Sequence, residues 1–240
     1  MSQFNLIEHQ TILQCIEISK TYLTPSSTTK VLENFSLTLC KGEIGMLMGP
    51  SGCGKTTLLM IAGGVLIPDS GSCAVQGKDL FMMDVNQKIA FRAAHISFLF
   101  QQLHLFPSLS VLDNVALPLL IDGVSPEQAH HQAKELLVRM ELQSCINARL
   151  ETLSGGEKQR VALARALIKE ASIILCDEPT SNLDTDSALL AFTLINEYAK
   201  NRGCTFLIST HDERIIDYAD QIYRFNGLND YQLCIKDVCI

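Results

Sequence analysis

The sequence predicts an α/β fold with a mostly parallel sheet at its core. From residue 172 onward, strand-like and helix-like segments alternate, which implies crossover connections between parallel strands. Near residue 50, a glycine-rich turn joins a strand-like segment to a helix-like one, as such a fold requires. At 240 residues, the chain is long enough for one substantial domain. We therefore expect residues 1–240 to form a single domain.

The first hundred residues are rich in strand-like segments. Apolar, β-branched and aromatic residues, bounded by turn residues, predict strands over residues 11–19, 31–39, 42–48, 70–77 and 95–100. Between the third and fourth of these, from Lys55 to Ala62, the apolar pattern is helical. We expect this part to be dominated by strands.

The middle of the chain is mostly helical. Ser125 is a good helix cap, with Pro126 in the first turn and Gln128 three residues after the cap. Apolar residues follow at helical spacing, which places a helical insert at approximately residues 102–168. The strand 172–177, a helix over 185–200, the strand 204–210, a helix over 212–219 and a final strand then complete the core.

Composition excludes several classes of function. The net charge is −7, and the lysines and arginines are scattered, so we expect no nucleic-acid partner. No stretch reaches the roughly 18 to 20 apolar residues that span a bilayer, so we expect a cytoplasmic chain that reaches membranes through a partner. The 9 cysteines are dispersed without a CxxC pair, which favours reduced thiols.

A phosphate-binding loop is the strongest chemical signal. The pattern GxxxxGK[ST] stands between a strand and a helix. Backbone N–H groups there can bind phosphate oxygens, Lys55 adds a positive charge, and Thr56 offers a hydroxyl to Mg²⁺. A chance glycine turn is the alternative. The candidate nucleotide-binding residues are Gly49, Pro50, Ser51, Gly52, Cys53, Gly54, Lys55, Thr56 and Thr57.

The apolar strand in the segment SIILCDEP (residues 172–179) ends in two acids. Asp177 and Glu178 emerge together at the carboxyl edge of the expected sheet. Asp177 can hold Mg²⁺ through water, whereas Glu178 can orient or deprotonate the water that attacks a γ-phosphate. The alternative is a pair of surface acids at a strand end.

The segment LSGGEKQR (residues 153–160) narrows the class of protein. Read locally, Ser154 and Glu157 form a capping box before an apolar helix. Together with SNLD after the acids and a His after the next strand, the pattern closely resembles the nucleotide-binding domain of ABC ATPases over nearly the whole chain. The resemblance implies a P-loop NTPase core with a mostly parallel sheet, an N-terminal antiparallel β subdomain and an inserted helical subdomain.

The resemblance also implies ATP and Mg²⁺ as cofactors and a head-to-tail dimer. In this family, two domains enclose ATP, and the LSGGE segment of one completes the site of the other. Ser154, Gly155, Gly156 and Glu157 would thus contact the nucleotide of a second copy or of a homologous subunit. A capped helix start with two glycines suits this role, because its N–H groups can approach a γ-phosphate.

Four further residues gain roles by the same resemblance. Gln101 is similar to the glutamine that senses Mg²⁺ and the attacking water, with a polar strand end as the alternative. His211 resembles the histidine that contacts the γ-phosphate, although it could simply precede a helix. Asp184 matches a loop at the dimer interface, and it could also cap the next helix. Tyr22 resembles the aromatic residue that stacks on adenine, against an ordinary strand aromatic.

Within the family, the segments NVALPLL and CDEPTSNLD look most like the bacterial branch of lipoprotein-release, macrolide-efflux and cell-division ATPases. That branch implies separate transmembrane permease subunits, a position on the cytoplasmic face of the inner membrane, and export or extraction of a lipoprotein, lipid or drug-like substrate. The apolar segment 104–107 could dock a helix of such a partner or turn within the domain's own core. An importer ATPase and a soluble ABC ATPase without a membrane partner are the alternatives.

Overall fold

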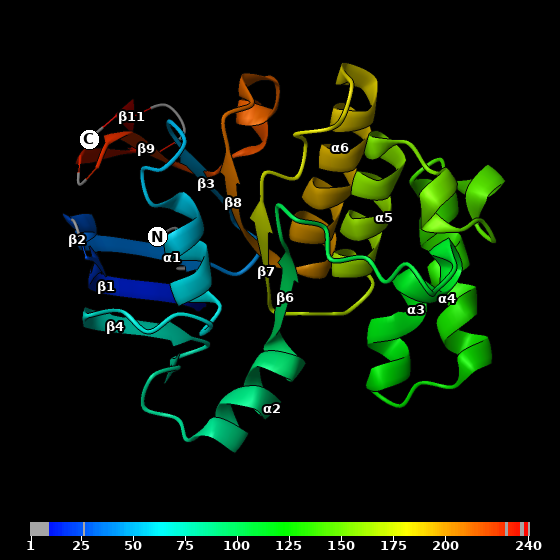
Figure 1. Cartoon of the computed structure of the whole chain (residues 1–240), viewed down its shortest axis with the longest axis horizontal. Helices are drawn as coiled ribbons and strands as arrows, with labels where there is room; N and C mark the ends of the chain where they lie inside the picture. The colour runs from blue at the N-terminus through cyan, green and yellow to red at the C-terminus, as the bar shows by residue number, and fades with distance from the viewer. Residues whose placement is uncertain (1–9, 26, 229, 236–237, 240) are drawn as a thin grey trace, which may run out of the picture.

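The computed structural model describes residues 10–25, 27–228, 230–235 and 238–239. Its elements form a seven-stranded sheet in the centre, a four-stranded sheet on one side and a group of helices on the other (Figure 1). The strands are β1 (Thr11–Thr24), β2 (Ser27–Cys40), β3 (Ile44–Met48), β4 (Ser70–Val75), β5 (Lys78–Asp79), β6 (Ile96–Leu99), β7 (Ile173–Asp177), β8 (Thr205–Thr210), β9 (Gln221–Gly227), β10 (Asp230–Ile235) and β11 (Val238–Cys239).

The helices lie mainly in the middle of the chain. The α-helices are α1 (Lys55–Ala62), α2 (Val85–His95), α3 (Val111–Ile121), α4 (Pro126–Arg139), α5 (Gly155–Leu167) and α6 (Thr185–Arg202). Short 3-10 helices occur at η1 (Gln143–Cys145), η2 (Leu150–Thr152) and η3 (Glu213–Tyr218). Helices α3, α4 and α5 all lie between β6 and β7 in the sequence, on the side of the molecule away from the four-stranded sheet (Figure 1).

The large sheet has the order β11-β10-β9-β3-β8-β7-β6. Its five strands from β9 to β6 pair in parallel, and β10 and β11 add an antiparallel edge. The expected α/β architecture with a mostly parallel sheet is thus confirmed. The small sheet, of order β2-β1-β4-β5, is antiparallel throughout, as the family resemblance implied.

Two hydrophobic cores cover the two faces of the large sheet. Alternate residues of β7 divide between them: Ile174 and Cys176 pack with α3 to α6, while Ile173 and Leu175 pack with α1 and the small sheet. Strand side chains alternate between faces, so only a strand apolar at every position can serve both cores. The one acidic side chain of β7, Asp177, therefore stands at the end of the strand.

The short strand β5 and the edge strands β10 and β11 were not expected, and two helices also differ from the sequence-based expectations. Helix α2 was missed, although Asp84 and Gln87 form a capping box at its start that the sequence displays. The expected helix over 212–219 is the 3-10 helix η3 instead. There, the Asp212 carboxylate accepts a hydrogen bond from the Arg214 backbone N–H, and the Ala219 N–H reaches back three residues to Ile216. Hydrogen bonds that reach back three residues define the tighter 3-10 turn.

The segment after β6 is fixed by one buried amide. Asn114 on α3 is fully buried, and its Oδ1 accepts a hydrogen bond from the Phe106 N–H at 2.8 Å. Its amide nitrogen lies 2.9–3.3 Å from the carbonyl oxygens of Phe106, Leu109 and Ser110. A single side chain thereby ties the backbone between Phe106 and Ser110, which lies outside the helices and strands, to α3.

We predict that Asn114→Ala lowers the free energy of unfolding by about 2–4 kcal/mol, because the fully buried Asn114 amide is lost together with its hydrogen bonds to the backbone of the segment after β6. Urea denaturation followed by circular dichroism measures the change. Asn86→Ala is the matched control: Asn86 is exposed on α2, and its loss should change stability by less than about 0.5 kcal/mol. Equal shifts for the two variants would refute this account of Asn114.

Candidate functional site

The glycine-rich loop joins the buried strand β3 to helix α1. Gly49 has φ 152°, and a Cβ at this position would lie 2.5 Å from the Phe225 carbonyl oxygen. Gly54, with φ 106°, would place a Cβ 2.9 Å from the Val31 carbonyl oxygen. Any larger residue would clash at either position, so the tight turn depends on these two glycines.

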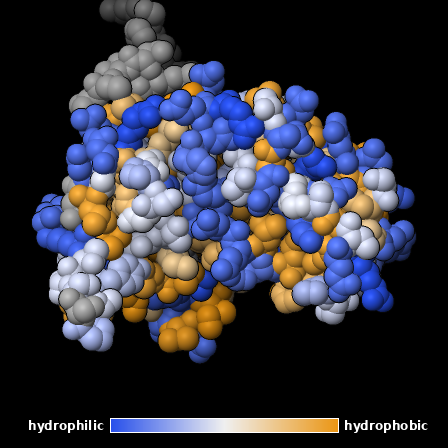
Figure 2. Space-filling model, turned by 45° about the horizontal axis from the view of Figure 1, so that its top comes forward, coloured by the Kyte–Doolittle hydropathy of each residue, from blue (hydrophilic) through white to orange (hydrophobic). Residues whose placement is uncertain are grey.

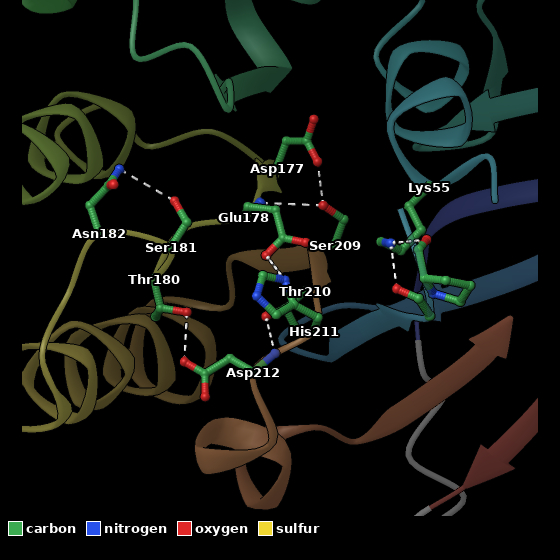
Figure 3. Close-up of polar contacts among 12 residues, drawn as sticks. Lys55, Asp177, Glu178, Thr180, Ser181, Asn182, Ser209, Thr210, His211 and Asp212 are labelled. Atoms are coloured by element: carbon green, nitrogen blue, oxygen red, sulfur yellow. Dashed lines mark hydrogen bonds and ion pairs between the residues drawn. The ribbon is translucent and has the colours of Figure 1, made fainter. Parts of the chain in front are cut away.

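Lys55 lies over this loop. Its Nζ donates hydrogen bonds to the carbonyl oxygens of Gly49 at 2.7 Å and Pro50 at 2.9 Å (Figure 3). Nζ also lies 3.9 Å from the Cys53 sulfur. The Cys53 side chain is only 3% exposed, so its thiol is a packing group of the loop rather than an accessible nucleophile.

Thr56 and Asp177 bring hard oxygen atoms together at the carboxyl edge of the sheet. The Thr56 hydroxyl, at the start of α1, donates to Asp177 Oδ2 at 2.8 Å. The second carboxylate oxygen of Asp177 accepts a hydrogen bond from the Ser209 hydroxyl on β8. A hydroxyl and a carboxylate oriented by its neighbours are the ligand types that Mg²⁺ prefers, so this pair fits the ion.

Glu178 follows Asp177 and points toward the end of β8 (Figure 3). Its backbone is left-handed, with φ 53°, an unusual conformation for a residue other than glycine. His211 Nδ1 lies 3.0 Å from Glu178 Oε2, and the side chains of Glu178 and His211 are 12% and 71% exposed. The carboxylate is thus shielded but remains at the edge of the site, beside an imidazole.

Lys55, Thr56, Asp177 and Glu178 line a cavity of about 400 Å³, whereas His211 contacts Glu178 from outside its lining. Tyr22 stands at one side, where its hydroxyl is 3.4 Å from Thr57 Oγ1, and Gln101 stands at the end of β6. The structure therefore brings together residues that are far apart in the sequence. The lining comprises Tyr22, Val31, Ser51, Gly52, Gly54, Lys55, Thr56, Thr57, Gln101, Asp177 and Glu178.

The LSGGE residues do not line this cavity. Ser154 caps α5: its hydroxyl accepts from the Glu157 N–H, and the Glu157 carboxylate accepts from the Ser154 N–H at 2.8 Å. Hydrogen bonds from the backbone and hydroxyl of Ser154 hold the pKa of Glu157 below its usual value. Ser154 and Gly155 are exposed, so the start of this helix is open to another molecule.

Asp184 lies outside the cavity as well. Its carboxylate accepts a hydrogen bond from the Ser187 N–H at 2.8 Å and so caps α6. The capping alternative for Asp184 is therefore true, while its place at a dimer interface stays a prediction. Gly156 packs against the loop between β7 and α6, because a Cβ on Gly156 would lie 3.1 Å from the Asn182 carbonyl oxygen.

Sequence reasoning missed two polar residues behind the site. Ser209 on β8 is fully buried and contacts both acids, since its hydroxyl also lies 3.3 Å from the Glu178 N–H. Gln159 on α5 is fully buried too, and it reaches the Glu178 carbonyl oxygen. Gln159 precedes the buried Leu163 by four residues, so the helical period of α5 is the signal that could have found it.

Comparison with known proteins identifies the class of this site. The sequence pattern of the ABC transporter family matches residues 32–181. The chain belongs to this family. As a member, it binds a nucleotide and hydrolyses ATP. The phosphate loop and the two acids of the cavity, with the histidine beside Glu178, are the parts of the site that suit this reaction.

Curated relatives of this ABC ATPase include two lipoprotein-releasing system ATP-binding proteins named LolD. The one from Colwellia psychrerythraea is 42% identical over 84% of this chain and 78% of its own length. The one from Buchnera aphidicola (Schizaphis graminum) is 40% identical over 87% of this chain and 91% of its own length.

Two solved structures of the ATP-binding cassette MJ0796 are similar in fold. Each superimposes with a TM-score of 0.86 at 32% identity, over 92% of this chain and 97% of the cassette. Both are dimeric, and one is a post-hydrolysis state bound to ADP and Pi.

We predict that Glu178→Gln retains ATP binding but lowers ATP hydrolysis about 100-fold or more, because the amide keeps the shape but cannot accept a proton from water. Steady-state phosphate release and equilibrium ATP binding measure the two properties separately. Hydrolysis at a near-parental rate would overturn the assignment of Glu178.

Lys55→Ala is the contrasting variant. It removes the positive charge that faces the phosphates, so the affinity for ATP itself should fall along with hydrolysis. If Lys55→Ala binds ATP as tightly as the parent, Lys55 does not hold the phosphates.

Proposed function

We propose that this ATPase drives the release or extraction of lipoproteins from a bacterial inner membrane, together with separate permease subunits. The single observation that carries this proposal is the 42% identity to a lipoprotein-releasing ATPase over 84% of the chain. Similarity at this level along most of the chain supports a shared task as well as a shared fold. The segments NVALPLL and CDEPTSNLD had favoured the same branch.

The geometry supports distinct roles for the residues of the cavity. Lys55 and the loop N–H groups bind the phosphates. Thr56 and Asp177 would hold Mg²⁺, and Gln101 would contact the same ion. Mg²⁺, when bound, neutralises charge on the phosphate oxygens. Glu178 accepts the proton of the attacking water, and His211 stabilises the γ-phosphate oxygens as charge develops. Tyr22 stacks on the adenine ring.

Each ATP site is completed by a second copy of the chain or by a homologous subunit. The exposed start of α5 offers backbone N–H groups at a helix N-terminus, a good ligand for a phosphate, yet it lies outside its own subunit's cavity. A head-to-tail dimer would place Ser154, Gly155, Gly156 and Glu157 over the partner's nucleotide. The dimeric state of both MJ0796 cassettes supports this arrangement.

The permease subunits account for the expected position of the chain at the cytoplasmic face of the inner membrane. Among the residues that the structure describes, no helix is both long and apolar enough to cross a bilayer. On the face seen in Figure 2, hydrophobic residues occur in small groups among hydrophilic ones, without one broad apolar surface. Contact with the membrane would then come through the permease subunits.

We propose the segment 104–107 as a contact for a permease helix. Phe106 is 49% exposed and thus accessible to a partner, while Leu105 packs against the core. Asn114 fixes its carboxyl half, and Arg165 donates hydrogen bonds to the carbonyls of Leu103 and His104. A rigid apolar segment next to Gln101 would transmit motion between a partner and the nucleotide.

We assign the segment 104–107 to a helical insert, approximately residues 102–168, within one domain spanning residues 1–240.

Inner-membrane vesicles that contain the chain and its permease subunits test this function. We predict ATP-dependent release of a radiolabelled lipoprotein into the soluble fraction with the parental chain and none with Glu178→Gln. Release of lipoprotein and stimulation of ATPase activity by lipoprotein should occur together. Stimulation by a macrolide or a small solute, with no release of lipoprotein, would assign the ATPase to a different transport task.

A further inference from the structure

Gln159 is a polar residue in an apolar environment. It lies on the buried face of α5, where its neighbours at helical spacing, Ala162, Leu163 and Ala166, are all in the hydrophobic core. Its side chain is 0% exposed. A buried amide is costly unless its donor and acceptor both find partners, so the contacts of Gln159 show what it holds in place.

The two ends of this amide bind two parts of the loop that follows β7. Gln159 Nε2 donates to the Glu178 carbonyl oxygen at 3.1 Å. Gln159 Oε1 accepts from Asn182 Nδ2, also at 3.1 Å. Glu178 is the first residue of this loop, and Asn182 lies beyond Ser181 in it (Figure 3). One side chain therefore spans the loop that begins with the catalytic carboxylate.

The conformation of Glu178 explains why the loop needs such support. A left-handed backbone is unfavourable for glutamate and persists only where its surroundings hold it. On one side, the Glu178 N–H donates to the Ser209 carbonyl oxygen at 3.0 Å. On the other side, the Glu178 carbonyl accepts from Gln159 and, at a longer 3.3 Å, from the Ser181 N–H.

We propose that Gln159 is a positioning residue that holds the Glu178 backbone in this conformation and so aims its carboxylate at the attacking water. The inference rests on the assignment of Glu178 as the residue that activates this water. Gln159 also lies on the helix that begins with the LSGGE residues, and Gly156 packs on Asn182. The Gln159 amide thereby connects α5 to the loop after β7, which contains both Asn182 and Glu178.

The variant Gln159→Met tests the proposal, because methionine has a similar length and no hydrogen-bonding amide. We expect kcat for ATP hydrolysis to fall about tenfold, the effect of losing roughly one hydrogen bond to the reacting conformation. KM and the equilibrium affinity for ATP should not change, since Gln159 does not line the cavity. An unchanged kcat would overturn the proposal.

Ser172→Ala is the matched control for stability. Ser172 lies at the other end of β7, where its hydroxyl contacts Gln76 and His95, far along the strand from Asp177. Its loss should lower the urea midpoint without lowering kcat. If Ser172→Ala lowers kcat as much as Gln159→Met, the effect of Gln159 is one of general stability.

Combination with Glu178→Gln separates positioning from a structural role. If Gln159 acts through the Glu178 carboxylate, Gln159→Met should cause little further loss of hydrolysis in the Glu178→Gln protein. The same tenfold loss in both backgrounds would contradict the proposal. Parental activity of Glu178→Gln alone would instead overturn the assignment of Glu178, so the two failures can be told apart.

Asn182→Ala provides the test if Gln159→Met does not fold. Asn182 is exposed, and its truncation removes the contact that orients the Gln159 amide without altering a buried side chain. We expect a smaller fall in kcat that is also lost in the Glu178→Gln background. A fall of equal size in both backgrounds would count against Gln159 as the link.

Discussion

The parallel register of β3, β8 and β7 is the constraint on which the rest of the site depends. In this register, Met48 pairs with Thr210 and Asp177 pairs with Ser209, so three strands reach their carboxyl ends side by side. All three strands are buried on both faces, which leaves their ends as the place for polar side chains. The phosphate loop, the two acids and His211 each follow one of these ends. A shift in pairing would separate the lysine from the carboxylates even if each strand still formed.

A second constraint separates the start of α5 from the cavity of its own subunit. The capping box of Ser154 and Glu157 makes this helix start well formed by itself, although neither residue touches the phosphate loop. At the same time, the buried face of α5 carries Gln159 to the back of Glu178. One helix thus has an exposed start, which we propose as a phosphate ligand, and a buried face that contacts the loop beginning at Glu178. In a dimer, this geometry gives each subunit a direct connection between the two nucleotides.

The sequence predicted the residues with a chemical role better than it predicted the buried hydrogen bonds that hold them in place. Strands such as β7 and the helix α1 follow from continuous apolar runs and a glycine-rich turn, and the motif residues converge because parallel strands end at one edge. The role of Ser209 could not be read from the sequence, because a hydroxyl at a buried position has no pattern of its own until the strand pairing is known. Helix α2 was missed because its apolar residues do not form one buried face. Val85 and Ile89 are exposed, and only Phe91 is buried. The 3-10 helix η3 arose from local hydrogen bonds of Asp212 that override the helical period of DERIIDYA.

The central claim is that each ATP site is shared between two chains whose own residues are already joined through α5. A crystal structure of the Glu178→Gln protein with ATP and Mg²⁺ tests it most directly, because the slowed reaction should trap the nucleotide. The account predicts two chains arranged head to tail, with the phosphates contacted by Lys55 of one chain and by the N–H groups at the start of α5 in the other. A nucleotide contacted by Lys55 alone, with the start of α5 of every chain exposed to solvent, would contradict it.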